Sequence, residues 1–290
     1  MRRRFKQVDV FTSRRFLGNP VAVVLDADGL ADEAMQAIAR WTNLSETAFV
    51  LPPVQGGDYA LRIFTPASEL AFAGHPTLGS AHAVLEAGIV PAGRAGFVQE
   101  CRAGRLRITV EAAGPERLLF VATPAPTFAP AADAHLDEIA EALGIPGLPG
   151  VRPLVVDMGP RWLVLDLGDG ELVAPLAPRM SALAAASRSM GITGVTVFGR
   201  QAGIDARLRV RSFAPAEGVP EDPVCGSGNA CVAAYLRETG QLAGVGAFYI
   251  ASQGRELGRD GRVHVRVDES GGGIALGGAA VTCVDGTIDA

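Results

Sequence analysis

Two short stretches of the sequence place glycines and ionisable residues directly before an apolar run. They are "FAGHPT", residues 72–77, and "EDPVCGSGNA", residues 221–230. Each predicts a glycine turn that opens a helix, where the first backbone N–H groups lack an acceptor within the helix and the helix dipole is positive. Such a position suits a small anion, for example a carboxylate. The candidate binding residues are Gly74, Gly226 and Ser227, and His75 beside Gly74 is a candidate for chemistry.

Other kinds of site do not fit these residues. The stretch "CGSGNA" lacks the lysine of a phosphate-binding loop, and neither turn gives G-x-G-x-x-G after a strand. The cysteines form no C-x-x-C pair and the histidines form no H-E-x-x-H motif. The sequence therefore predicts neither a metal site nor a bound cofactor. The cysteines and histidines are Cys101, Cys225, Cys231, Cys283, His75, His82, His135 and His264.

The surroundings of the two turns repeat. The segment "YALRIFTPASELAFAGHPTLGSAHAVLEAG" and the segment "ARLRVRSFAPAEGVPEDPVCGSGNACVAAYLRETG" both run from a strand through F-x-P-A, an acidic loop and a glycine turn into a helix. Upstream, "GNPVAVVLD" corresponds to "GPRWLVLD", and downstream "CRAGRLRITV" corresponds to "GRDGRVHVRV". Self-similarity of this kind predicts two copies of one fold. If the copies face each other, the two helix starts converge on one anion site.

The residue patterns predict the elements of each copy. "ALRIF", "RLRITV" and "GRVHVRV" alternate apolar and polar residues, which is typical of strands with one solvated face. The helices after the turns are small or apolar almost all round, as a helix enclosed by protein requires. We expect an α+β fold of two pseudo-symmetric lobes, each a barrel-like, mostly antiparallel sheet wrapped around a central helix.

The boundary between the copies is expected at the proline-rich "ATPAPTFAPAAD", which suits an extended connector. The N-terminal lobe then covers residues 1–121, and a final strand at about 278–290 returns to it. The C-terminal lobe covers residues 122–277.

Composition excludes several partners. The 290 residues carry 26 basic and 31 acidic side chains, for a net charge of -5, and the basic residues are scattered. Nucleic acid is therefore not an expected partner. No uncharged apolar run reaches the roughly 18 residues that cross a bilayer, and charges interrupt the segment after the N-terminal arginines where a signal peptide needs an apolar run. We expect a soluble, cytoplasmic protein.

One acidic residue lies where the two copies differ. Glu46, in "NLSETAFV", occupies the turn between the first helix and the following strand, and its counterpart in the second copy lies around Gly194. Burial beside Leu44, Ala48 and Phe49 would raise the pKa of this carboxyl and make it a proton carrier near neutral pH. The alternative is a surface glutamate at the start of a strand.

These motifs together carry a family resemblance. "VDVFTSRRFLGNPVAVV", "NLSETAFV", "FTPASELAFAGHPTLGSA" and "EDPVCGSGNA" resemble the phenazine-biosynthesis isomerase-like (PhzF-like) family, which is related in fold to diaminopimelate epimerase. The similarity covers essentially the whole chain. It implies two lobes with the active site between them, commonly a homodimer, and cofactor-independent proton transfer on a small carboxylated ring, dihydro-hydroxyanthranilate in the founding reaction.

The resemblance also implies roles for individual residues. Glu46 matches the proton-transferring glutamate of the family. His75 and Asp222 match its polar partners beside the substrate, while Gly74 and Ser227 match the helix-start positions that hold the substrate. Moving a proton between ring carbons requires one base that can also act as an acid.

One departure leaves alternatives open. The related epimerases use a cysteine at each turn, whereas here only Cys225 does, because Ala73 fills the other position. Cys225 is either a packed relic or a thiol made reactive by the helix start. Beside the glutamate isomerase there remain a cysteine-assisted epimerase or racemase of an amino or hydroxy acid, and a non-catalytic module that binds a small acid or a protein.

Overall fold

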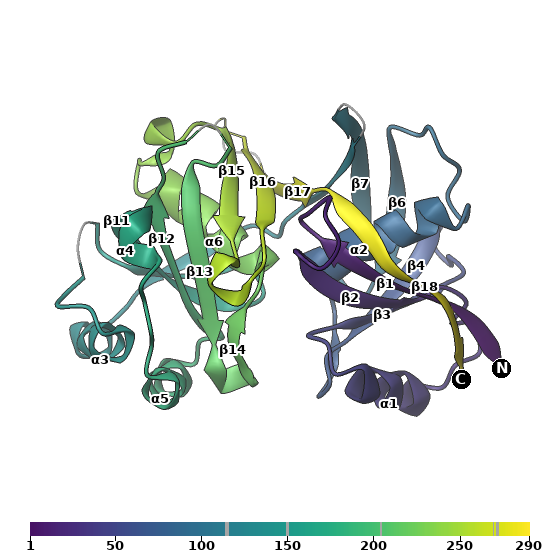
Figure 1. Cartoon of the computed structure of the whole chain (residues 1–290), viewed down its shortest axis with the longest axis horizontal. Coiled ribbons are helices and arrows are strands. Elements are labelled where there is room, and N and C mark those ends of the chain that lie inside the picture. Colours follow the sequence, from purple (N-terminus) through teal and green to yellow (C-terminus); the bar gives the residue numbers. More distant parts are fainter. Residues whose placement is uncertain (114–115, 149–150, 204, 269, 271–272) are drawn as a thin grey trace. The chain divides into compact units, whose positions relative to one another are not determined.

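The computed structural model describes residues 1–113, 116–148, 151–203, 205–268, 270 and 273–290. The chain forms two compact units, each of which mixes strands and helices (Figure 1). Unit 1 consists of Met1–Ala122 and Gly277–Ala290, and unit 2 consists of Thr123–Leu276. The protein is therefore a mixed α/β protein.

The elements of unit 1 are mostly strands, with one helix on the outside of the sheet and one against its inner face. In chain order they are β1 (Arg2–Val10), β2 (Asn19–Val24), α1 (Asp32–Thr42), β3 (Thr47–Leu51), β4 (Tyr59–Phe64), β5 (Glu69–Leu70), α2 (Gly74–Glu86), β6 (Gly96–Cys101), β7 (Gly104–Ala113), β8 (Glu116–Ala122) and the C-terminal strand β18 (Ala280–Asp289).

Unit 2 has a similar succession with additional helices. Its elements are β9 (Thr127–Pro130), α3 (Asp133–Leu143), β10 (Leu154–Asp157), β11 (Arg161–Asp169), α4 (Gly170–Val173), α5 (Met180–Met190), β12 (Gly194–Arg200), β13 (Leu208–Ala214), β14 (Val219–Asp222), α6 (Gly226–Glu238), β15 (Phe248–Gln253) and β16 (Gly261–Val267), with 3-10 turns at Pro215–Glu217, Leu242–Gly244 and Arg255–Leu257. Strand β17 (Ile274–Gly278) spans the boundary between the units.

The two units use the same strand pairings. In unit 1, β2 is antiparallel to β1 and parallel to β3, β3 is antiparallel to β4, and β4 is parallel to β6. In unit 2, β11 is antiparallel to β10 and parallel to β12, β12 is antiparallel to β13, and β13 is parallel to β15. Each sheet is therefore mixed, with parallel pairs where a helix or a longer connection joins the two strands.

The helix after each glycine turn is enclosed by strands of its own unit. Helix α2 contacts β1, β2, β3, β4, β8 and β18, and α6 contacts β10, β11, β12 and β16. Nearly every residue of α2 after Gly74 is buried, so its sequence of small and apolar residues matches its environment. Gly79 lets α2 approach the sheet, because a Cβ at this position would overlap the side chain of Val21.

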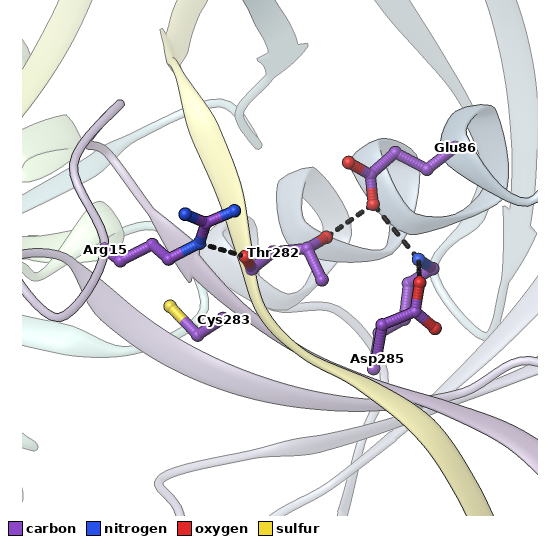
Figure 2. A pocket seen from close by; sticks show the side chains of 6 residues that line it. Arg15, Glu86, Thr282, Cys283 and Asp285 are labelled. Atoms are coloured by element: carbon purple, nitrogen blue, oxygen red, sulfur yellow. Dashed lines mark hydrogen bonds and ion pairs between the residues drawn. The ribbon is translucent and has the colours of Figure 1, made fainter.

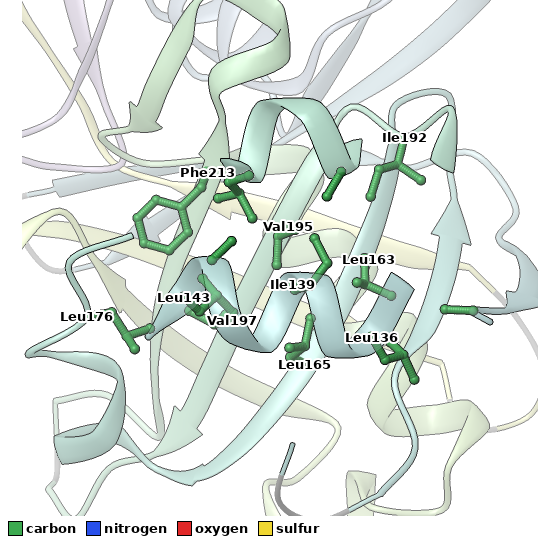
Figure 3. Packing of buried hydrophobic residues seen from close by; sticks show 14 of the residues in the cluster. Leu136, Ile139, Leu143, Leu163, Leu165, Leu176, Ile192, Val195, Val197 and Phe213 are labelled. Atoms are coloured by element: carbon green, nitrogen blue, oxygen red, sulfur yellow. The ribbon is translucent and has the colours of Figure 1, made fainter. Parts of the chain in front are cut away.

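The outer helices contribute amphipathic faces to separate cores. Met35 and Ala39 of α1 pack with Phe49 and Phe64 in unit 1. In unit 2, the apolar face of α3 packs on β11 and β12, as Figure 3 shows for Leu136, Ile139, Leu143, Leu163, Leu165, Val195 and Val197. Packing in these cores holds in place the strands that carry the polar residues of the candidate site.

Several local predictions are confirmed. The two central helices begin at Gly74 and Gly226, and the strand predicted in "GRVHVRV" is β16, in which buried and half-buried residues alternate. The proline-rich connector is more ordered than predicted, because Thr127–Pro130 forms β9 and pairs with β10. Among the described residues, no helix is both long and apolar enough to span a membrane.

Candidate active site

In unit 1, the two ionisable residues singled out by the sequence lie side by side. Oε2 of Glu46 is 3.4 Å from Nε2 of His75, and the exposed fractions of the two side chains are 16% and 7%. Glu46 belongs to the turn before β3, and His75 is the second residue of α2. The partly buried position of Glu46 differs from that of a freely solvated surface glutamate.

The ring of His75 is held in one tautomer. It forms a hydrogen bond with the backbone of Pro20, and because proline has no N–H, the ring must be the donor. Since Nε2 faces Glu46, the donor is Nδ1. Burial lowers the pKa of His75 to about 3, although the bond to Pro20 opposes this shift. The ring is therefore neutral near pH 7, and its Nε2 has the chemistry of a hydrogen-bond acceptor, not of a donor.

The turn that carries Glu46 is fixed by the end of α1. Asn43 adopts the left-handed conformation (φ 53°) and ends the helix, a role to which asparagine is suited. The hydroxyl of Thr42 lies 2.7 Å from the hydroxyl of Thr47, the first residue of β3. The helix end at Asn43 and the contact between Thr42 and Thr47 hold the chain on both sides of Glu46.

At the start of α2, Pro76 has no N–H and the N–H of Thr77 bonds to the backbone oxygen of Ala73, so the N–H groups that an anion can approach are those of Gly74 and His75. The N-cap residue, Ala73, provides no side-chain acceptor. Gly74 has open space where a side chain would project, since a Cβ there would meet nothing within 4 Å. Unpaired N–H groups beside open space form the kind of site that binds an anion.

In unit 2, the two adjacent acids of "EDPVCGSGNA" have different environments. Glu221 forms a bidentate pair with Arg211, with both N–O distances 2.8 Å and both side chains buried. Asp222, the last residue of β14, accepts a hydrogen bond of 3.0 Å from the N–H of Val224. Burial raises the pKa of Asp222 to about 6, although its bonds with Cys225 and Val224 oppose the shift. Asp222 therefore titrates close to neutral pH.

Cys225 caps α6 instead of presenting a free thiolate. Its Sγ accepts a hydrogen bond of 3.2 Å from the N–H of Gly228, and its thiol also bonds to Asp222. Burial and the nearby carboxylate raise the pKa of the thiol well above its ordinary value. A low pKa, which a reactive thiol at a helix start requires, is absent.

Ser227 is the second residue of α6 and is half-buried. Its Oγ accepts a hydrogen bond of 3.0 Å from the indole N–H of Trp162 and lies 3.5 Å from Sγ of Cys225. The structure thus places Asp222, Cys225, Gly226 and Ser227 together in unit 2, and Glu46, Gly74 and His75 together in unit 1.

Sequence reasoning missed three residues that support these groups. They are Arg211, which pairs with Glu221, Trp162, which donates to Ser227, and Gln253, whose amide bonds to the backbone oxygen of Asp222 and to the side chain of Asn229. All three are buried polar or donor-bearing side chains. The glutamine that ends the mainly apolar stretch "FYIASQ" is the one signal the sequence offers.

A pocket at the other end of α2 has a different character. It has a volume of about 490 Å³ and is lined by Lys6, Arg15, Glu86, Thr282, Cys283 and Asp285 (Figure 2). The ammonium group of Lys6 lies 2.7 Å from Asp285 and 3.2 Å from Glu86, which also accepts from Thr282. These groups bind one another and connect β18 to α2, so we assign them a structural role.

Across the described part of the chain, no group of three or more His, Cys, Asp or Glu side chains is arranged to hold a metal ion.

Comparison with known proteins agrees with the fold and with the motifs. The chain is 41% identical to "Antisense-enhancing sequence 1" of Schizosaccharomyces pombe, with 97% of each chain covered. It is 36% identical to the trans-2,3-dihydro-3-hydroxyanthranilate isomerase of Pseudomonas aeruginosa, covering 92% of this chain and 91% of the relative. A crystal structure of a PhzF-family phenazine biosynthesis protein from Bacillus anthracis matches all of both chains with a TM-score of 0.88 at 26% identity. Residues 8–286 match the model of the phenazine biosynthesis-like (PhzC-PhzF) family, and the chain belongs to this isomerase family.

Proposed function

We propose that this protein is a cofactor-independent isomerase that moves a proton on a small carboxylated, cyclic substrate, with Glu46 as the acid and base. The observation that carries the proposal is the pair formed by Glu46 and His75, with Oε2 and Nε2 3.4 Å apart. A relative named for the isomerisation of trans-2,3-dihydro-3-hydroxyanthranilate supports this substrate class.

The pair gives Glu46 a means of carrying a proton. Its carboxylate takes a proton from one ring carbon of the substrate, and the resulting carboxylic acid returns a proton to another carbon, so the atoms balance without a co-reactant. Because neutral His75 donates Nδ1–H to Pro20, its Nε2 is able to accept a hydrogen bond from the protonated carboxyl of Glu46. General acid and base catalysis of this kind contributes about 100- to 10,000-fold to a rate.

The remaining candidate residues bind the substrate in this proposal. The N–H groups at the start of α2, where Gly74 leaves open space, and the hydroxyl of Ser227 at the start of α6 hold its carboxylate and polar substituents. Asp222, with a pKa of about 6, is able to bind a substrate amine or hydroxyl as carboxylate or as acid. The two units are then the two lobes of a diaminopimelate epimerase-like fold.

The cysteine-assisted epimerase is a weaker alternative. Two-base racemisation by thiols needs a cysteine at both turns, and Ala73 occupies the first. Cys225 is buried and caps α6, and the pKa of its thiol is raised. A non-catalytic module is also disfavoured, because binding alone does not require a partly buried carboxyl beside a neutral imidazole.

The test is solvent-deuterium incorporation into trans-2,3-dihydro-3-hydroxyanthranilate and into a panel of other cyclic and linear carboxylates. Glu46→Gln keeps the size of the side chain but cannot carry a proton, so exchange should fall by about 100-fold or more. Glu33→Gln, on the exposed face of α1, serves as the matched control and should leave exchange unchanged. Full activity of folded Glu46→Gln would refute the proposal.

A further inference from the structure

The second residue of each central helix is held by the strands beneath it. In unit 1 this residue is His75, which bonds to the backbone of Pro20 in β2. In unit 2 it is Ser227, which accepts a hydrogen bond from Trp162 of β11. Because β2 and β11 occupy equivalent places in the pairing scheme, the two contacts are structurally comparable.

Trp162 lies at the start of a parallel strand pair in unit 2. It is the first residue of β11 that pairs with β12, opposite Gly194. In unit 1, the corresponding pair of β2 and β3 begins with Ala22 opposite Thr47. Strand β11 thus carries at its start an indole donor that reaches the start of the helix.

We propose that Trp162 is a positioning residue that sets the direction of the Ser227 hydroxyl. This inference rests on the proposed function, in which Ser227 binds the substrate.

The chemistry of the two groups fixes the direction of the bond. An indole N–H only donates, so the 3.0 Å contact makes Ser227 Oγ the acceptor. Trp162 is 3% exposed, and a buried donor that loses its partner is costly, which keeps the contact in place. The proton of Ser227 must therefore point away from Trp162.

The group that now faces this proton is a weak acceptor. Sγ of Cys225 lies 3.5 Å from Ser227 Oγ and already accepts from Gly228. A substrate carboxylate is a stronger acceptor than a thiol sulfur, so it should take over the Ser227 proton when it binds. Because Trp162 orients the Ser227 hydroxyl before the substrate binds, less conformational entropy is lost on binding. Trp162 would therefore raise the affinity for the substrate.

A double-mutant cycle tests this role through exchange into trans-2,3-dihydro-3-hydroxyanthranilate. Trp162→Phe removes the donor but keeps an aromatic ring, and it should raise KM about two- to tenfold with kcat unchanged, the range that one hydrogen bond gives. In the Ser227→Ala background the same change should have no further effect on KM. Independent, additive effects of the two substitutions would overturn the proposal.

A second measurement does not depend on turnover. The chain has two tryptophans, and Trp41 is 77% exposed, so Trp41→Phe leaves the indole N–H resonance of Trp162 alone in an NMR spectrum. Ser227→Ala should move this resonance upfield because the acceptor is lost. An unchanged resonance would overturn the inference even if the enzyme is active. If the wild-type protein shows no exchange while the resonance moves as expected, the proposed function fails and the contact between Trp162 and Ser227 stands.

Discussion

Glu221 and Asp222 are adjacent in sequence, but their carboxyl groups lie in different environments. Arg211 binds both carboxylate oxygens of Glu221, whereas Asp222 is buried beside the thiol of Cys225 and the N–H of Val224. The pKa of Asp222 is consequently raised to about 6. A carboxyl in this state reduces the stability of the folded protein at neutral pH, and such a cost is common at functional sites.

Asp222→Asn should therefore stabilise the protein. The folded state keeps a proton on Asp222 up to about pH 6, while the unfolded state releases it near pH 4, so the free energy of unfolding falls as the pH rises between these values. The free energy of unfolding of Asp222→Asn does not decrease in this way, so at pH 7 it should exceed that of the wild-type protein by about 2 kcal/mol. Urea unfolding between pH 4 and 8 measures the difference. Glu221→Gln is the control, and it should destabilise because it leaves Arg211 buried without its partner.

His75 should produce the opposite dependence on pH. Its pKa is about 3 in the folded state and is close to 6.5 in an unfolded chain, so the unfolded state binds the proton first as the pH falls. Stability is lost across the window from about pH 6.5 to 3. His75→Gln should show a smaller loss between pH 7 and pH 4, by on the order of 2–3 kcal/mol. Equal losses in the two proteins would contradict the neutral, buried imidazole.

Cys225 provides a test that separates a structural thiol from a nucleophile. Cys225→Ser keeps an acceptor for the N–H of Gly228 and a donor for Asp222, so it should retain activity. Cys225→Ala removes both interactions and should cost about 1 kcal/mol in the free energy of unfolding. Solvent-deuterium exchange and urea unfolding of the two variants measure these effects. A folded but inactive serine variant would support the epimerase alternative instead.

The parts of the site that sequence could predict are those set by local signals. The helix starts at Gly74 and Gly226, and the turn that carries Glu46, follow from glycine and polar residues placed between periodic segments. Their positions are decided within a few residues of chain. Local pattern therefore identified them without knowledge of the tertiary structure.

The remaining features depend on contacts between distant segments. Glu221 and Asp222 look alike in sequence, and only the pairing of β13 with β14 brings Arg211 to the first of them. Trp162 reaches Ser227 across 65 positions of sequence. The strand β9 forms inside a proline-rich connector because β10 supplies its partner. All three features depend on contacts between segments that are distant in the sequence. Composition and periodicity do not indicate such contacts.

Two glycines of α2 give the last prediction, because they differ in what surrounds them. A Cβ at Gly74 meets nothing within 4 Å, and alanine favours a helix over glycine, so Gly74→Ala should fold at least as well as the wild-type protein. Gly79→Ala instead forces a methyl group against Val21 and should cost about 1–3 kcal/mol. If the open space at Gly74 is where the substrate carboxylate approaches the helix, Gly74→Ala should raise KM for exchange while its melting temperature is maintained. A Gly74→Ala variant with unchanged KM would show that the substrate does not bind at this helix start.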